Sequence, residues 1–213
     1  DISDKKKIDS DFATNYLYVA GLTIHSTQDS NIQTIMETEF EKNKHIITNN
    51  GSTSQASMVI MDHSTGYVVG CVGGLGKKDT VRGFNRATQS LRQNGSAGKP
   101  LSVLVPAIDK NIITASSIYD DTKSEFMNTT NEIYSPRDND NHYLGNITVR
   151  RAIESSQNIP FVRIMEQVTP KTSIKYLEKM GISTLTDKDD NLALALGGLD
   201  KGVSNLEMSG AYA

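Results

Sequence analysis

Ser96 and Lys99 are the two residues of this chain whose types and spacing most directly suggest covalent catalysis. Positions i and i+3 lie on the same face of a helix, so a lysine amine placed there can reach the serine hydroxyl and take its proton. If the helix begins near Ser96, its free N–H groups and positive end would also stabilise an oxyanion beside that serine. The amine must first lose its own proton, which burial or a nearby positive charge promotes. A bare Ser-x-x-Lys is weak evidence, because Ser3 to Lys6 matches it too, and a chance helix start is the plain alternative.

Ser156 and Asn158 form a second polar pair, on either side of Gln157, in the only Ser-x-Asn of the chain. A hydroxyl and a carboxamide two residues apart in an extended turn face the same way. Together they could pass a proton and hold a substrate amide. The alternative is a polar cap at the end of a helix, so neither motif alone decides the function.

Composition and charge exclude several classes of function. The chain has 213 residues, of which 37% are hydrophobic, enough for one large domain or two small ones with a buried core. Its net charge of −3 provides no basic field, so we expect no nucleic-acid partner. No apolar run approaches the roughly 18 residues of a membrane span. Cys71 is the single cysteine and the four histidines are scattered, so we expect no metal site and no cofactor.

Hydrophobic spacing in the first third of the chain predicts a helix followed by a hairpin. A helix is expected over residues 30–46, opened by a capping box between Ser30 and Gln33. Residues 55–61 and 67–72 are rich in β-formers and are separated by a turn sequence, which indicates a β-hairpin.

The two motifs are expected on helical elements. A buried helix should start near Ser96, with an apolar stripe through Leu101, Leu104, Val105 and Ile108. Residues 120–145 have few apolar anchors and should form a long surface excursion. Further helices are expected from a Thr148 cap to just before Asn158, from Pro160, over residues 171–180, and from a capping box between Ser204 and Glu207.

The segments around both motifs resemble class A penicillin-binding proteins, the bifunctional peptidoglycan synthases. The resemblance is carried by five stretches in the family's order: residues 22–29, 62–74, 84–100, 145–162 and 194–213. It covers about residues 20–213 and implies an α/β penicillin-binding-protein/serine β-lactamase-like transpeptidase fold, an antiparallel sheet with a helical cluster, incomplete in this chain. We therefore expect a linker segment over residues 1–19 and the N-terminal portion of a transpeptidase domain over residues 20–213.

The resemblance implies a D,D-transpeptidase that cross-links peptidoglycan stem peptides and is the target of β-lactam antibiotics. Ser96 would be the acylated nucleophile and Lys99 its general base, while Ser156 would pass a proton to the leaving group. In the family's reaction the serine attacks the penultimate D-Ala carbonyl, the terminal D-Ala leaves, and an amine of a neighbouring strand takes the acyl group.

The resemblance also implies how substrate and partners are bound. Asn158 would bind the substrate's peptide amide and help to position Lys99, and Gln157 and Tyr143 are further candidates for substrate binding. The implied partners are stem peptides and their lipid-linked precursor, β-lactams as covalent inhibitors, and the cell-wall synthesis machinery. The expected location is the outer face of the bacterial cytoplasmic membrane, with the anchor absent from this chain.

Two departures from the family pattern lie beside the nucleophile. Asn94 stands where the family commonly has proline, and Gly98 where it commonly has an aromatic residue. A glycine within a helix costs roughly 1 kcal/mol relative to alanine, so we expect both residues to loosen this helix.

The family's third motif, Lys-Thr-Gly or Lys-Ser-Gly, does not occur in the 213 residues. Loss of one oxyanion donor typically costs about 3–4 kcal/mol in the transition state, so the lone chain should be nearly inert. We expect a second chain to carry the rest of the domain. Two other functions stay open: a D,D-carboxypeptidase or β-lactam-hydrolysing enzyme with the same acylation, and a non-catalytic module that binds peptidoglycan or senses β-lactams.

Overall fold

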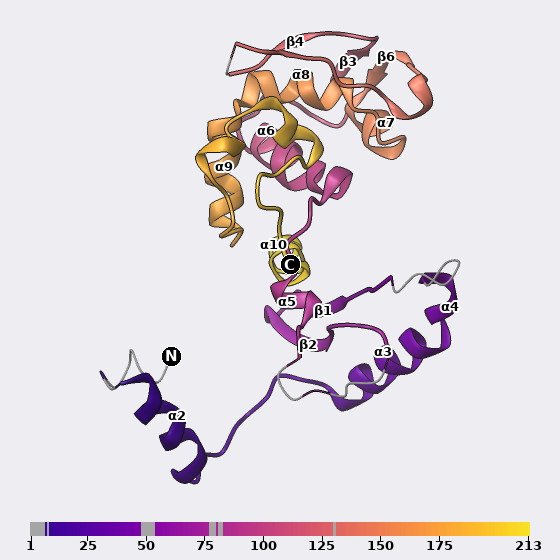
Figure 1. Ribbon diagram of the computed structural model, residues 1–213. Helices are drawn as coiled ribbons and strands as arrows, with labels where there is room; N and C mark the ends of the chain where they lie inside the picture. The colour runs from indigo at the N-terminus through magenta and orange to yellow at the C-terminus, as the bar shows by residue number, and fades with distance from the viewer. Residues whose placement is uncertain (1–6, 8, 48–53, 77–79, 81–82, 130) are drawn as a thin grey trace.

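A β-hairpin with a helix packed on it forms the N-terminal part of the chain. The computed structural model describes residues 7, 9–47, 54–76, 80, 83–129 and 131–213 (Figure 1). Within these residues no helix is long and apolar enough to cross a membrane. The N-terminal elements are the helices α2 (Ser10–Val19), α3 (Ser30–Lys42) and α4 (Lys44–Ile47), and the strands β1 (Met58–Asp62) and β2 (Tyr67–Val72).

Most of the predicted linker, residues 1–19, is either helix α2 or lies outside the described residues, since residues 1–6 and 8 are not described. In Figure 1, α2 stands apart from the hairpin, and an extended segment joins α2 to α3. The division between linker and domain remains a prediction.

The predicted helix over residues 30–46 is confirmed as α3 followed by α4, but its cap is different from the predicted one. The side chain of Asp29 accepts hydrogen bonds from the backbone N–H groups of Asn31 (2.8 Å) and Ile32 (3.0 Å). The predicted capping partner, Gln33, instead bonds the backbone of Cys71 on β2, donating to its carbonyl oxygen at 3.0 Å and accepting from its N–H at 2.9 Å. Gln33 therefore fastens the helix to the hairpin.

The predicted hairpin is confirmed: β1 pairs antiparallel with β2, from Met58 opposite Val72 to Asp62 opposite Tyr67, with an irregularity between Ile60 and Met61. The last helix of the chain, α10 (Asn205–Tyr212), packs against β1. It opens with the predicted capping box of Ser204 and Glu207, so this prediction is also correct.

The segment that carries Ser96 is wound in three ways and is not one regular helix. A 3₁₀ turn, η1 (Gly95–Gly98), leads into a π-helical turn, η2 (Pro100–Leu104), and then into α6 (Val105–Asp109). Pro100 and Pro106 each lack the N–H that a continuous α-helix needs at its position, which accounts for the changes in winding.

The predicted apolar stripe of this segment is only partly buried for the same reason. Leu101 is buried, but 39% of Val105 and 54% of Ile108 are exposed. Val103 and Ala107 face the core instead.

Most of the described residues between positions 120 and 145 are exposed, as predicted for a surface excursion, but the segment also contains short paired strands and a few buried side chains. The strand β3 (Ile118–Asp121) pairs with β6 (Gly145–Thr148), and β4 (Phe126–Met127) pairs with β5 (Ile133–Tyr134). Phe126 is buried in the hydrophobic core. Asp121 and Asp138 are also buried, and hydrogen bonds from neighbouring backbone and side-chain groups replace part of the water around their carboxylates.

The helical part surrounds α8 (Ile159–Val168), whose Ile159, Phe161, Val162, Ile164 and Met165 have no exposed surface. Figure 1 shows α8 beneath the short strands and α9 beside α6. The Thr148 cap of α7, the start of α8 and the extent of α9 are confirmed to within one residue, but α7 ends at Glu154 and not just before Asn158 as predicted. The remaining elements are α5 (Arg86–Gln89), η3 (Asn139–Asn141), α7 (Val149–Glu154), α9 (Pro170–Lys179), η4 (Asp187–Asp189) and η5 (Leu192–Leu196).

The turn after η5 lies directly against the turn that opens η1. Gly197 has a left-handed φ of 76°, and a Cβ atom there would lie 2.0 Å from the carbonyl oxygen of Gly95 and 2.5 Å from Oδ1 of Asn94. Only glycine fits, because the neighbour is backbone and cannot move aside as a side chain can.

We predict that Gly197→Ala lowers the free energy of unfolding by roughly 3 kcal/mol or more, since a left-handed alanine and an overlap with backbone add together. Gly181→Ala is the matched control, because Gly181 is also left-handed (φ 90°) but a Cβ there meets nothing within 4 Å. It should cost only about 1–2 kcal/mol. Equal losses in chemical denaturation would contradict the proposed close contact.

Candidate active site

Lys99 is the largest fully buried side chain among the described residues, and its ammonium group is surrounded by oxygen atoms. Nζ lies 2.8 Å from the carbonyl oxygen of Ser156, 2.9 Å from that of Gln157 and 2.7 Å from Oδ1 of Asn158. The hydroxyl oxygen of Ser156 is a fourth neighbour at 3.3 Å. An ammonium group has three N–H donors, so the three shorter contacts saturate it. The Ser-x-x-Lys and Ser-x-Asn motifs, about 60 residues apart, thus meet at one atom.

Burial lowers the pKa of Lys99 from its ordinary 10.5 to about 8, although the negative charges of Asp138 and Asp121 act in the opposite direction. The ring of Phe161 lies 5.1 Å from Nζ and adds a weaker attraction for the charged form. The result is an amine that can lose its proton much closer to neutral pH than an exposed lysine can.

The Ser-x-Asn motif lies in the tight turn between α7 and α8, and not in an extended turn as predicted. Ser156 adopts a left-handed φ of 55°. The N–H of Gln157 donates to the carbonyl oxygen of Ala152, five residues earlier, at 3.0 Å, which is the hydrogen bond of a Schellman motif at a helix end. This reversal turns the carbonyl groups of Ser156 and Gln157 toward Lys99.

Asn158 is held at both ends of its amide. Its Nδ2 donates to the carbonyl oxygen of Arg137 at 2.6 Å, while Oδ1 accepts from Lys99. The amide orientation is fixed, because a carbonyl only accepts and an ammonium only donates. The backbone N–H of Asn158 donates to Oδ1 of Asp138. This geometry agrees with a positioning role toward Lys99, and the predicted contact with a substrate amide remains a prediction.

Ser96 is exposed, one turn before Lys99 on the same short segment. Among the hydrogen bonds described for the chain, none joins Oγ of Ser96 to Nζ of Lys99. The turn is held from the other side by α10, since the hydroxyl of Tyr212 donates to the carbonyl oxygen of Ala97 at 2.5 Å. The structure therefore brings Lys99, Ser156 and Asn158 together and leaves Ser96 facing solvent beside them.

Gln157 is buried and Tyr143 is partly buried, and the predicted role of both in substrate binding remains a prediction. Gln157 is buried, and its Nε2 donates to Oδ2 of Asp121 at 2.9 Å and to the carbonyl oxygen of His142 at 3.0 Å. Tyr143 packs against the core, and its hydroxyl is buried with no hydrogen-bond partner among the described residues. Both side chains support the site from within.

Asp121 and Asp138 are the site residues that sequence reasoning missed. They lie in the polar region that was predicted to be a surface loop, and each contacts the Ser-x-Asn turn directly. Nothing in their local spacing distinguishes them from the other acidic residues between positions 120 and 141, so only their contacts with the distant Gln157 and Asn158 identify them.

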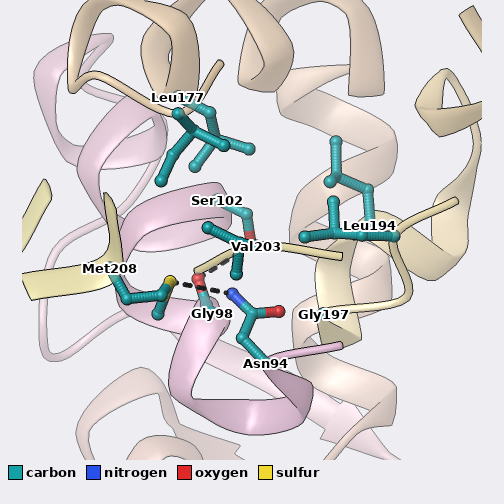
Figure 2. A pocket seen from close by; sticks show the side chains of 10 residues that line it. Asn94, Gly98, Ser102, Leu177, Leu194, Gly197, Val203 and Met208 are labelled. Atoms are coloured by element: carbon teal, nitrogen blue, oxygen red, sulfur yellow. Dashed lines mark hydrogen bonds between the residues drawn. The ribbon is translucent and has the colours of Figure 1, made fainter. Parts of the chain in front are cut away.

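The departures at Asn94 and Gly98 occupy a common space (Figure 2). A Cβ atom on Gly98 would lie 2.7 Å from Nδ2 of Asn94, so the asparagine amide fills the space that a side chain at position 98 would need. The same Nδ2 lies 3.3 Å from Sδ of Met208 on α10. The side chain of Asn94 therefore packs against Gly98, whereas the helix propensity of glycine alone predicts a looser segment.

The family follows from comparison with known proteins. Residues 56–210 match the family model described as the penicillin binding protein transpeptidase domain. The chain belongs to the penicillin-binding protein transpeptidase family. The resemblance seen in the motifs is thereby confirmed, and so is the expected fold class of α/β elements with antiparallel strands and a helical cluster.

Penicillin-binding relatives cover the whole chain. It is 34% identical to penicillin-binding protein 1A of Clostridium tetani over 229 residues, which is 100% of this chain and 29% of that protein. It is 32% identical to penicillin-binding protein 1F of Bacillus subtilis over 188 residues, which is 85% of this chain and 25% of that protein. The chain thus spans less than a third of the length of these relatives.

Solved penicillin-binding proteins share the fold. Penicillin-binding protein 1A from Haemophilus influenzae superposes with a TM-score of 0.66 at 26% identity, over 78% of this chain and 25% of that one. PonA1 from Mycobacterium tuberculosis superposes with a TM-score of 0.74 at 20% identity, over 99% of this chain and 53% of that one, and supports the fold alone.

We predict that Asn158→Ala lowers the free energy of unfolding by about 1–3 kcal/mol, because it leaves a buried ammonium donor and the carbonyl oxygen of Arg137 without a partner. The control is Asn146→Ala, an exposed asparagine on β6, which should change stability by no more than about 0.5 kcal/mol. Chemical denaturation of the two variants beside the native protein measures both. Equal effects would mean that the amide does not hold the cluster.

Proposed function

We propose that this chain forms part of a D,D-transpeptidase that cross-links peptidoglycan stem peptides through an acyl-enzyme on Ser96. The observation that carries the proposal is the buried Lys99 ammonium held by the Ser156–Asn158 turn, in a chain of the transpeptidase family. That arrangement supplies a base of lowered pKa beside a serine at the start of a helical turn.

In the proposed acylation, Lys99 takes the hydroxyl proton of Ser96. With a pKa of about 8, about one-tenth of the Lys99 amines are neutral at pH 7, and the others must lose a proton first. Catalytic hydrogen bonds are often long in the absence of substrate and shorten in the complex, so the free position of Ser96 is compatible with this role.

The bonds then change as follows. Oγ of Ser96 bonds to the carbonyl carbon of the penultimate D-Ala, and the bond from that carbon to the nitrogen of the terminal D-Ala breaks. The leaving nitrogen takes a proton from the hydroxyl of Ser156, which regains one from Lys99 at 3.3 Å. The nitrogen of an amine from a neighbouring strand next bonds to the same carbonyl carbon, the ester bond to Oγ breaks, and the proton that the amine loses restores the hydroxyl of Ser96. Asn158 is the proposed contact for the peptide amide of the substrate.

The rest of the proposed machinery lies outside these 213 residues. The Lys-Thr-Gly-like motif, with its cation and oxyanion donor, would come from a second chain that carries the remainder of the domain, and the first chain alone would be nearly inert. The complete protein would act on stem peptides and their lipid-linked precursor at the outer face of the cytoplasmic membrane, together with the cell-wall synthesis machinery. β-Lactams would acylate Ser96.

We predict that the complete protein forms a covalent adduct with a fluorescent penicillin and that Ser96→Ala abolishes it, because no other group supplies the nucleophile. The surface variant Ser116→Ala should label as the native protein does. Labelling is read on a denaturing gel, and the modified peptide is identified by mass spectrometry. An adduct that persists in Ser96→Ala, or a native protein that takes no label, would exclude the proposed acylation. Assays with stem-peptide substrates separate cross-linked dimers, expected here, from the trimmed monomers of a carboxypeptidase.

We predict that Ser156→Ala slows acylation by about 10²- to 10⁴-fold, the range typical for loss of a proton-transfer group. Ser155→Ala is the matched control, since the neighbouring hydroxyl donates to the carbonyl oxygen of Arg151 at 2.6 Å on its own helix. That variant should retain the native rate. Similar rates of labelling in Ser156→Ala and the native protein would remove Ser156 from the mechanism.

A further inference from the structure

Asp121 and Asp138 form a buried pair of acids behind the Lys99 cluster. Neither side chain is more than 4% exposed, and the two carboxyl groups lie within hydrogen-bonding reach of each other. Two carboxylates so close repel each other unless a proton lies between them. Each has one oxygen, Oδ1 of Asp121 and Oδ2 of Asp138, that is buried without a hydrogen-bond partner among the described residues.

The other oxygen of each acid is committed to the Ser-x-Asn turn. Oδ2 of Asp121 accepts from Nε2 of Gln157 at 2.9 Å and from the backbone N–H of Leu144 at 2.8 Å. Oδ1 of Asp138 accepts from the backbone N–H of Asn158. The pair thus holds two successive residues of the turn whose oxygens bind Lys99, without contacting Nζ itself.

The positive charge of Lys99 interacts with both acids, although its hydrogen bonds go to neutral oxygens. Burial and the neighbouring Asp138 raise the pKa of Asp121 to about 6. Arg163 on α8 donates to the carbonyl oxygen of Asp120 at 2.9 Å and so faces the neighbouring residue. Other titratable residues on the surrounding elements include Tyr119 and Asp120 on β3, Tyr134 on β5, Glu166 on α8, and Arg137, Asp140, His142 and Tyr143 between β5 and β6.

We propose that Asp121 and Asp138 are positioning residues, and that Asp121 takes up a proton as the pH falls and thereby changes how readily Lys99 loses its own. With the proton present, the pair carries one negative charge and its two unpartnered oxygens are joined. Without it, a second negative charge behind the turn favours the protonated form of Lys99 and so opposes its action as a base. This inference rests on the proposed function for its effect on acylation, although the proton uptake itself does not.

Asp121→Asn imitates the protonated pair at every pH. The asparagine oxygen can accept from Leu144 and Gln157, and its NH₂ group can donate to the free oxygen of Asp138. Asp120→Asn is the matched control. It removes the same charge from the adjacent residue of β3, whose carboxylate is 45% exposed and lies 3.4 Å from Nη2 of Arg163.

The first measurement is the rate of acylation of the full-length protein by a fluorescent penicillin from pH 5 to 9. Below about pH 5.5 Asp121→Asn and the native protein should react equally, because both then lack the second charge. Near pH 7 the variant should react about threefold faster, corresponding to a decrease of roughly half a unit in the pKa of Lys99. Above about pH 9 the ratio should return to one. A ratio that does not vary with pH, as a purely structural effect or Asp120→Asn would give, overturns the coupling to Lys99.

The second measurement does not depend on catalysis. A carboxyl whose pKa is raised by folding destabilises the folded state increasingly as the pH rises through its pKa, since its charged form is disfavoured there. The difference in Tm between Asp121→Asn and the native protein should therefore grow between pH 4 and 7 in favour of the variant. A difference in Tm that does not change with pH would overturn the proposed proton uptake. A native protein that takes no label while this difference grows counts against the proposed function and leaves the acid pair intact.

Discussion

The ammonium group of Lys99 is removed from water, and such a transfer costs several kcal/mol unless other oxygen atoms take the place of the lost solvent. Here three oxygens from consecutive residues, Ser156, Gln157 and Asn158, replace it at 2.7–2.9 Å. Two of them are backbone carbonyl oxygens, so their position depends on the path of the backbone and not on the type of side chain. The position of the lysine therefore depends on the path of a chain segment almost 60 residues later.

That requirement extends outward through the structure. Successive carbonyl groups face one atom because the left-handed Ser156 follows the end of α7 and α8 begins three residues later, at Ile159. The turn between the helices is in turn held by Asp121 and Asp138, which are buried although most of the described residues between positions 120 and 145 are exposed. On the opposite side, the turn that carries Ser96 is fixed by Gly197 and by Tyr212. The buried polar groups thus hold the turn whose oxygen atoms bind the ammonium group of Lys99.

Local sequence predicts the helix caps and turns of this structure, but it does not predict the contacts between distant segments. Helix caps such as Thr148 and Ser204 and the hairpin turn at residues 62–66 depend on neighbours within four residues, so their predictions are confirmed. The meeting of Lys99 with Asn158 was expected only through the family resemblance, because it depends on contacts between distant segments. The buried role of Asp121 and the burial of Gln157 were missed, since an acidic or amide side chain is buried only where distant partners satisfy it. Gly98 was misjudged because helix propensity takes no account of Asn94, whose amide occupies the neighbouring space.

A base buried in a protein has two conflicting needs, because the contacts that stabilise its charge also make its proton harder to remove. Direct contact between Lys99 and a carboxylate would raise its pKa, whereas uncharged oxygens stabilise the ammonium and still allow burial to lower the pKa to about 8. The chain keeps its two acids one residue farther away, bonded to Gln157 and to the backbone of Asn158. The negative charges then act on Lys99 only at a distance, and they orient the neutral oxygens that touch it. Ser96, the proposed nucleophile, can therefore stay open to solvent while the lysine beside it is buried.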